Sequence, residues 1–281
     1  MLACRRESRR IVPQQTGCIC NKFFIRTIVA ATQSRQGGTL QISGLCKWGG
    51  WCHAHGVTPQ GVIFDLDGTL VDSLSGIAAS LNRALAGLGL EPHSLRAIRG
   101  FIGNGVGVLM SRAAPQGSAA SLLVALEQAF KADYDLTWPQ GTGVYPGVAD
   151  LLAELQHRGV PLAVLSNKSH AFTTAMVSGL FPGVAFAAVL GQRSGIAHKP
   201  DPAGAMEIAT LLGQPVQWLT MVGDSTMDLE TAHRAGMRAV GVTWGYHDRD
   251  LLAAARPDMM IDSPEELLGF LETHSSLSSP P

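Results

Sequence analysis

Cysteine is absent from most of this chain. All five cysteines of the 281 residues lie before residue 53, namely Cys4, Cys18, Cys20, Cys46 and Cys52. Chemistry located after residue 58 can therefore use neither a disulfide framework nor a thiol. The spacing Cys18-Ile19-Cys20 is too short for a common zinc pair, so no metal site is expected there.

Acidic residues are scarce at the N-terminus. Residues 1–58 contain eight Lys or Arg and one acid, Glu7, which gives +7, whereas the remainder holds 13 basic and 21 acidic residues, which gives −8. A net-acidic main region argues against nucleic acid as a partner, because phosphate backbones need an extended basic face. We expect 1–58 to be a basic, disordered extension of a cytoplasmic protein. The alternatives are an organelle transit peptide, which the Arg enrichment fits, and a start codon assigned too far upstream.

Long hydrophobic runs are also missing. The uncharged stretch 171–192 is divided by Pro182-Gly183, so it predicts a buried helix followed by a buried strand and no membrane span. Residues 21–33 are interrupted by Arg26 and lack the apolar core of a secretory signal. A length of 281 residues with 46% hydrophobic composition predicts a globular protein with no membrane partner.

Strand and helix patterns alternate after residue 60. The expected strands are 61–65, 161–165, 186–190, 218–222, 238–242 and 259–261. The expected helices are 147–158, 201–212 and 226–235, each followed by glycine, and a last helix opened by the capping-box pattern at 263–266. This alternation predicts an α/β fold with a Rossmann-like, doubly wound parallel sheet covered on both faces.

The region 73–140 breaks this alternation. It shows helical periodicity, with apolar residues such as Ile77, Leu81 and Leu85, and no convincing strand. We expect a helical cap inserted after the first strand, a core made of 59–72 and 141–272, and a flexible tail at 273–281. An insert there hangs over the carboxyl ends of the strands, where ligands bind in open α/β sheets. The alternative is a helical subdomain without a lid function.

Two pairs of acids follow apolar strands. In Asp65-Leu66-Asp67-Gly68, strand alternation points both acids to one side, and Asp224 and Asp228 stand one helical turn apart after a second strand. Adjacent anions repel unless a cation lies between them, and Mg²⁺ is the usual ion for oxygen-only ligands. A solvated turn would be the default for the first pair alone.

Phosphate-binding residue types lie between these pairs. Ser166 and Asn167 end a predicted strand, and Lys199 precedes a proline. Either signal is weak by itself. Together with the acids, they predict a combined phosphate and metal site.

These four motifs, in this order, resemble those of the haloacid dehalogenase superfamily of phosphohydrolases, in its phosphoglycolate phosphatase-like branch. The motifs are Asp65 to Leu70, Ser166, Lys199, and Gly223 to Asp228, and the resemblance covers residues 60 to about 270. The segments 101–110 and 241–247 are also similar to phosphoglycolate phosphatase. The resemblance implies a Mg²⁺-dependent phosphatase acting on a small phosphate ester, with 2-phosphoglycolate the best candidate. It leaves open another sugar phosphate, pyrophosphate, or sugar phosphomutase chemistry.

The resemblance also implies residue roles. Asp65 would be the nucleophile that forms an aspartyl-phosphate, and Asp67 would protonate the leaving alcohol and then deprotonate water. Asp65, the main-chain carbonyl of Asp67 and Asp224 would hold Mg²⁺, with Asp228 more suited to orienting waters or Lys199. The phosphoryl oxygens would be bound by Ser166, Asn167 and Lys199.

Four residues of the cap are candidate substrate contacts. Gly103, Asn104 and Gly105 offer exposed amides to a small anion, and Arg112 is a possible carboxylate partner. A metal-free dehalogenase should lack the second acid of the first motif, and here Asp67 is present. A non-catalytic binding protein needs a lost motif residue, and none is missing. The sequence allows a monomer or a homodimer.

A chain shortened to begin at Pro59 tests the interpretation of the N-terminal segment. We predict that it folds and keeps full activity, because every motif lies after residue 60. Circular dichroism and turnover relative to the full chain measure this. Loss of folding on truncation would show that the first 58 residues belong to the folded unit.

Overall fold

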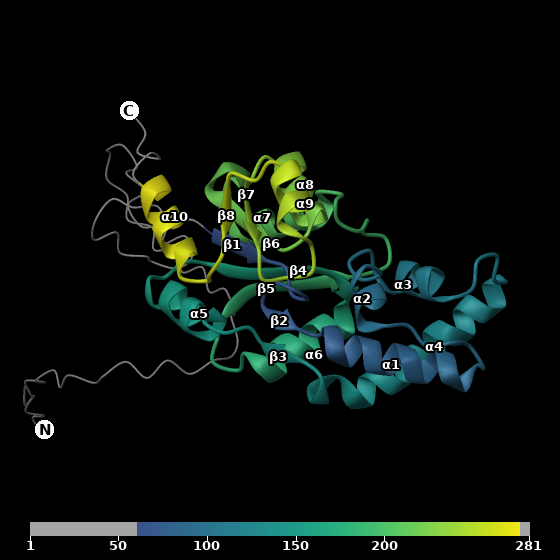
Figure 1. Ribbon diagram of the computed structural model, residues 1–281. Coiled ribbons are helices and arrows are strands. Elements are labelled where there is room, and N and C mark those ends of the chain that lie inside the picture. The colour runs from purple at the N-terminus through teal and green to yellow at the C-terminus, as the bar shows by residue number, and fades with distance from the viewer. Residues whose placement is uncertain (1–60, 276–281) are drawn as a thin grey trace, which may run out of the picture. The chain divides into compact units, whose positions relative to one another are not determined.

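The structure is a computed structural model that describes residues 61–275 (Figure 1). The expectations for residues 1–58, including all five cysteines, lie outside these residues. Most of the expected tail lies outside them too, although the last helix continues to Ser275, past the expected tail boundary at 272.

Six parallel strands form the main sheet. They are β1 (Gly61–Phe64), β4 (Leu162–Ser169), β5 (Phe186–Gln192), β6 (Leu219–Gly223), β7 (Arg238–Val242) and β8 (Met259–Ile261), in the spatial order β5-β4-β1-β6-β7-β8. The chain thus moves outward from β1 in one direction and then returns to build the other half. This arrangement confirms the doubly wound α/β fold and places the reversal of strand order beside β1.

Both faces of the sheet are buried. Along β1, Val62 and Phe64 belong to one apolar cluster and Ile63 to the other, as the two-residue period of a strand requires. The first cluster is covered by α5 (Val148–His157), α6 (His170–Leu180) and α10 (Glu266–Ser275), and the second by α7 (Ala203–Leu212), α8 (Thr226–Ala235) and α9 (Arg249–Ala254). A sheet packed on both sides explains why its strands read as apolar runs.

Most strands and helices begin and end within two residues of the positions predicted from the sequence. Gly159, Gly213 and Gly236 have positive φ angles after α5, α7 and α8, as their sequence positions predict. The uncharged stretch is a helix and a strand, α6 and β5. The last helix begins at Glu266, because residues 263–265 form a turn in which Ser263 contacts the Glu266 carboxylate.

The insertion consists of helices. They are α1 (Leu74–Gly87), α2 (Leu95–Arg99), α3 (Val106–Ala113), α4 (Ala120–Thr137) and the short 3-10 helix η1 (Trp138–Gln140). The helices α1 and α4 lie side by side in Figure 1 and bury Leu81, Leu85 and Leu126. Two short antiparallel strands, β2 (Val71–Asp72) and β3 (Gly143–Val144), join the two ends of the insertion.

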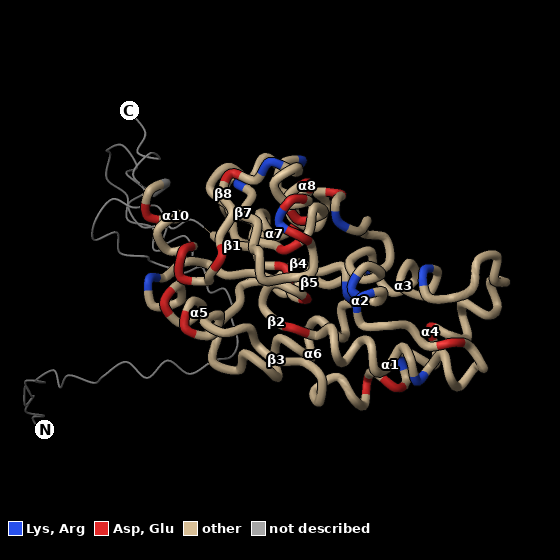
Figure 2. Tube along the Cα trace, viewed as in Figure 1, with Lys and Arg blue, Asp and Glu red and all other residues tan. Residues whose placement is uncertain are grey.

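Charged residues are interspersed over the described chain. Figure 2 shows acidic positions on α4, α5 and α8 and basic positions on α1, α2 and α3. Among the residues described, no helix has the length and apolarity needed to cross a membrane.

Two glycines bring the ends of the insertion into contact. The amide of Gly76 donates to the carbonyl of Gly141 at 3.0 Å, and a Cβ on Gly141 would lie 2.5 Å from the Gly76 Cα. Backbone cannot move aside as a flexible side chain can. The contact between the two ends of the insertion therefore requires glycine at residue 141.

Replacing Gly141 by alanine tests this contact. We expect Gly141→Ala to lower the free energy of unfolding by about 1–3 kcal/mol, because the added methyl group overpacks against backbone. The matched control is Gly143→Ala, where a Cβ meets nothing within 4 Å, and its expected effect is about 0.5 kcal/mol or less. Urea unfolding measures both, and equal effects would contradict the packing argument.

Candidate active site

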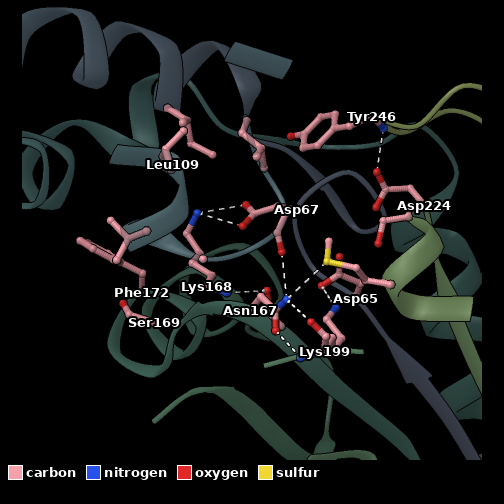
Figure 3. A pocket seen from close by; sticks show the side chains of 18 of the residues that line it. Asp65, Asp67, Leu109, Asn167, Lys168, Ser169, Phe172, Lys199, Asp224 and Tyr246 are labelled. Carbon is pink, nitrogen blue, oxygen red and sulfur yellow. Dashed lines mark hydrogen bonds and ion pairs between the residues drawn. The ribbon is translucent and has the colours of Figure 1, made fainter. Parts of the chain in front are cut away.

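The candidate residues meet at one edge of the sheet. Asp65 follows β1, Ser166 and Asn167 lie at the end of β4, and Asp224 follows β6, so three neighbouring parallel strands deliver them to the same edge. A cavity of about 830 Å³, including its open mouth, lies between this edge and the helices of the insertion. Figure 3 shows the side chains that line it.

Lys199 pairs with two acids that are distant in the sequence, Asp65 and Asp228. Its Nζ lies 2.8 Å from Oδ1 of Asp65 and 2.6 Å from Oδ1 of Asp228, and it donates to the carbonyl of Leu165 at 3.0 Å. The three charged groups are buried. The ammonium donates hydrogen bonds to Asp228 and to the Leu165 carbonyl and forms an ion pair with Asp65, and these contacts fix its position at the cavity.

Asp224 is held by the first motif and by the loop after β7. Its Oδ1 accepts from the Thr69 hydroxyl at 3.1 Å, and its Oδ2 accepts from the Tyr246 amide at 2.7 Å. Gly68, with φ of 91°, permits this approach, because a Cβ there would lie 2.2 Å from an Asp224 oxygen. Asp224 therefore reaches the cavity beside Asp65.

Three of the acids could share one ion. Asp65, Asp224 and Asp228 each offer an oxygen, and these oxygens lie within 4.8 Å of one another. Acids more than 150 residues apart in the sequence are thus brought together. Within this group Asp228 is the least available, because its Oδ1 accepts from Lys199 and its Oδ2 from the amide and hydroxyl of Ser225 at 3.0 and 2.6 Å.

The pKa values of two buried carboxylates are raised, because nearby positive charge does not offset the cost of burying them. Burial raises the pKa of Asp65 to about 7, although Lys199 opposes the shift. Burial, followed by repulsion from Asp65 and Asp228, also raises the pKa of Asp224 well above its usual value. Burial alone would lower the pKa of Lys199, but Asp228 and Asp65 more than compensate, so the lysine stays charged.

The donor set fits a hard divalent cation. Oδ1 of Asp65 has an ion-pair contact with Lys199 but no hydrogen bond. With all groups ionised, the three acids Asp65, Asp224 and Asp228 and the lysine Lys199 leave a net charge of −2, which one divalent ion would balance. Carboxylate oxygens at such short separations are ligands that Mg²⁺ prefers.

Asp67 has a different set of partners. Its Oδ1 accepts from the Ser73 hydroxyl at 2.5 Å and its two oxygens lie 3.1 and 3.0 Å from Nζ of Lys168. The Tyr246 hydroxyl lies 3.2 Å from the Ser73 hydroxyl and accepts from the Ser73 amide at 3.0 Å. Asp67 is therefore oriented by groups other than those around Asp65.

Sequence reasoning missed Lys168, Ser73 and Tyr246. A signal for Lys168 was present, because alternation along β4 places residue 168 on the same side as Ser166. Ser73 contacts Asp67 from six residues further along the chain, and Tyr246, which lies in the segment 241–247, contacts Ser73 from a distant loop.

Ser166 and Asn167 lie in the cavity wall, but the Asn167 side chain is fully occupied. Its Nδ2 donates to the carbonyls of Gly103 and Lys199 at 2.9 and 3.1 Å, and its Oδ1 accepts from the Lys199 amide at 2.8 Å. The side chain thus links the insertion to the Lys199 segment. At Asn167, a bound phosphate would have to be contacted by the backbone amide, because the side chain already has partners.

The residues proposed from the insertion divide into two groups. Gly103 and Gly105 line the cavity, and Asn104 contacts the sulfur of Met227. Arg112 does not line the cavity, because its exposed guanidinium turns back to the carbonyls of Gly100 and Phe101. The structure therefore does not bring Arg112 together with the other candidate residues.

Comparisons with known proteins agree with this geometry. A family model described as haloacid dehalogenase-like hydrolase matches residues 62–242. Phosphoglycolate phosphatase from Pseudomonas fluorescens is 33% identical over 235 residues, covering 80% of this chain and 85% of that protein, and phosphoglycolate phosphatase from Pectobacterium atrosepticum is 33% identical over 225 residues, covering 79% and 96%. A crystal structure of a predicted phosphoglycolate phosphatase from Haemophilus somnus superposes with a TM-score of 0.71 at 31% identity, covering 75% of this chain and 97% of that one.

The raised pKa of Asp65 predicts a pH-dependent stability. In metal-free protein the folded state holds the proton of Asp65 up to about pH 7, whereas the unfolded state releases it near pH 4. The free energy of unfolding should therefore fall as pH rises from about 4 to about 7, by a contribution on the order of a few kcal/mol.

Denaturation in EDTA across this pH range measures the effect. Asp65→Asn should reduce the fall, with Asp224 contributing what remains, whereas Asp135→Asn, at an exposed position of α4, should leave the profile unchanged. Parallel profiles for the wild type and Asp65→Asn would exclude Asp65 as the titrating group.

Proposed function

Because the chain belongs to the haloacid dehalogenase-like hydrolases and is a phosphoric monoester hydrolase, we propose that it cleaves small phosphate esters through Asp65 with bound Mg²⁺. The observation that carries this proposal is the convergence of Asp65, Asp224 and Asp228, whose oxygens lie close together, with Lys199 paired to Asp65 and Asp228 and Asp67 at the same cavity. Phosphoryl transfer needs positioning and charge neutralisation, and this arrangement offers both.

Asp65 and Asp67 divide the chemistry. A carboxylate oxygen of Asp65 attacks phosphorus, and the bond from phosphorus to the ester oxygen breaks. Asp67 gives its proton to the departing oxygen, which leaves as an alcohol. Asp67 then takes a proton from water, whose oxygen attacks phosphorus, and phosphate and free Asp65 are released.

Charged and polar groups around these two acids would hold the phosphoryl group. Lys199 and the hydroxyl of Ser166, which line the cavity, would contact the phosphoryl oxygens, and Asp228 keeps Lys199 in place. When bound, Mg²⁺ would offset the negative charge of the phosphoryl group, and Asp65, the Asp67 carbonyl and Asp224 are the groups that would hold it.

The helical insertion would close the site. Asn167 binds the Gly103 carbonyl, and Arg99 of α2 donates to the Gly245 carbonyl at 3.3 Å, so the insertion contacts the core at two points around the cavity. A closed cap excludes water other than the one that reacts. This supports a lid role for the insertion.

We propose 2-phosphoglycolate as the substrate. The support is the identity of about one third to proteins named phosphoglycolate phosphatase over most of their length. Another sugar phosphate, pyrophosphate and mutase chemistry are the alternatives that a substrate panel separates. Turnover of hexose phosphates with none of phosphoglycolate would overturn the choice.

Phosphate release with and without Mg²⁺ tests the proposed mechanism. The wild type should require Mg²⁺, and Asp65→Asn should abolish release while leaving the fold intact, because no acceptor remains for the phosphoryl group. Asp135→Asn is the matched control and should retain wild-type turnover. Substantial release by Asp65→Asn would exclude the covalent route.

A further inference from the structure

A second buried lysine faces the cavity and has no part in the mechanism above. The side chain of Lys168 is 10% exposed, and its Nζ contacts both Asp67 oxygens and, at 3.1 Å, the hydroxyl of Tyr134. The ammonium also lies 4.8 Å from the centre of the Tyr134 ring. Figure 3 shows Lys168 and Lys199 approaching the aspartates from different sides.

Lys168 lies on the leaving-group side of the site. Asp67 protonates the departing oxygen, so the alcohol half of the substrate must lie beside Asp67. Lys168 is in direct contact with Asp67, whereas Lys199 contacts Asp65 and Asp228. In a two-carbon acid ester the carboxylate is attached to the carbon next to the ester oxygen, which brings it toward Lys168.

Apolar side chains of the insertion and of α6 line the cavity, including Ile77, Leu109, Phe130 and Phe172. Figure 3 shows Leu109 and Phe172 on the same side of the cavity as Lys168. An anion buried against such a wall needs a cationic partner, and the low dielectric strengthens that pairing. Lys168 is placed to supply it.

Other basic groups in the described lining are less suited to this role. Lys131 is 44% exposed and pairs with Glu127 on its own helix at 2.5 Å. Lys199 pairs with Asp65 and Asp228, which places it on the side of the nucleophile and not on the leaving-group side beside Asp67. Burial lowers the pKa of His247, which favours its neutral form.

We propose that Lys168 binds a carboxylate on the leaving-group half of the substrate and thereby sets a preference for acidic phosphate esters. The inference rests on the proposed phosphatase function. An ammonium has three donors, so a substrate oxygen can replace the Tyr134 hydroxyl or one Asp67 oxygen without leaving the cation unpaired. Lys168 takes the place that the sequence alone suggested for Arg112.

Two esters that differ in one charged group test this role. They are 2-phosphoglycolate and 2-hydroxyethyl phosphate, and the readout is the ratio of their kcat/KM values with Mg²⁺ present. The wild type should prefer the acid, and Lys168→Met should lower the ratio about 10- to 100-fold, the effect of losing a hydrogen bond between charged groups. Lys168→Arg should retain part of the preference, and Lys131→Met should leave it unchanged.

Each contrary result has a distinct meaning. If Lys168→Met lowers both esters by the same factor, the lysine acts only by positioning Asp67 and the inference is overturned. If the wild type shows no preference between the esters, the inference is overturned, and this result does not depend on whether any variant folds. If the wild type hydrolyses neither ester nor any other phosphate ester, the proposed function fails and the inference fails with it.

Discussion

The repulsion among three buried carboxylates is the constraint on which the rest of the site depends. Asp65, Asp224 and Asp228 stand at one edge of the sheet, Lys199 pairs with the first and the last of them, and a divalent cation would complete the balance. Burying unpaired charge is costly, so a cluster of this kind persists only where a ligand or ion uses it. The same excess of negative charge that weakens the metal-free fold would bind the ion that phosphoryl transfer requires.

In the proposed reaction, the fold separates the phosphoryl group from the leaving group. The loops after β1 and β6 and the Lys199 segment would hold the phosphoryl group, and Lys168, Ser73 and Tyr134, which form a separate network around Asp67, would face the leaving group. Asp67 lies between these halves, two residues from Asp65 but in a different hydrogen-bond network. One strand end thus presents two acids in unlike surroundings, which suits one to attack phosphorus and the other to move a proton.

The sequence predicted the features that local patterns encode. Apolar runs, glycine stops and strand alternation located the six strands and the helices α5, α7 and α8, and the four motifs named the acids and Lys199. The pieces it missed are short or non-local: β2 and β3 have two residues each and α9 has six. Tyr246 contacts Ser73, the hydrogen-bond partner of Asp67, across a large sequence separation that no local pattern encodes. The guanidinium of Arg112 donates to backbone carbonyls outside the cavity, which its position in the sequence does not reveal.

Titration calorimetry of Mg²⁺ into metal-free protein tests the central claim most directly, since charge balance predicts a single bound ion per chain. We expect one ion to bind to the wild type and saturable binding to be lost in Asp224→Asn, which removes one of the converging carboxylates without touching Lys168 or Lys199. Absence of binding to the wild type, or binding that survives unchanged in Asp224→Asn, would contradict the claim that these acids share an ion.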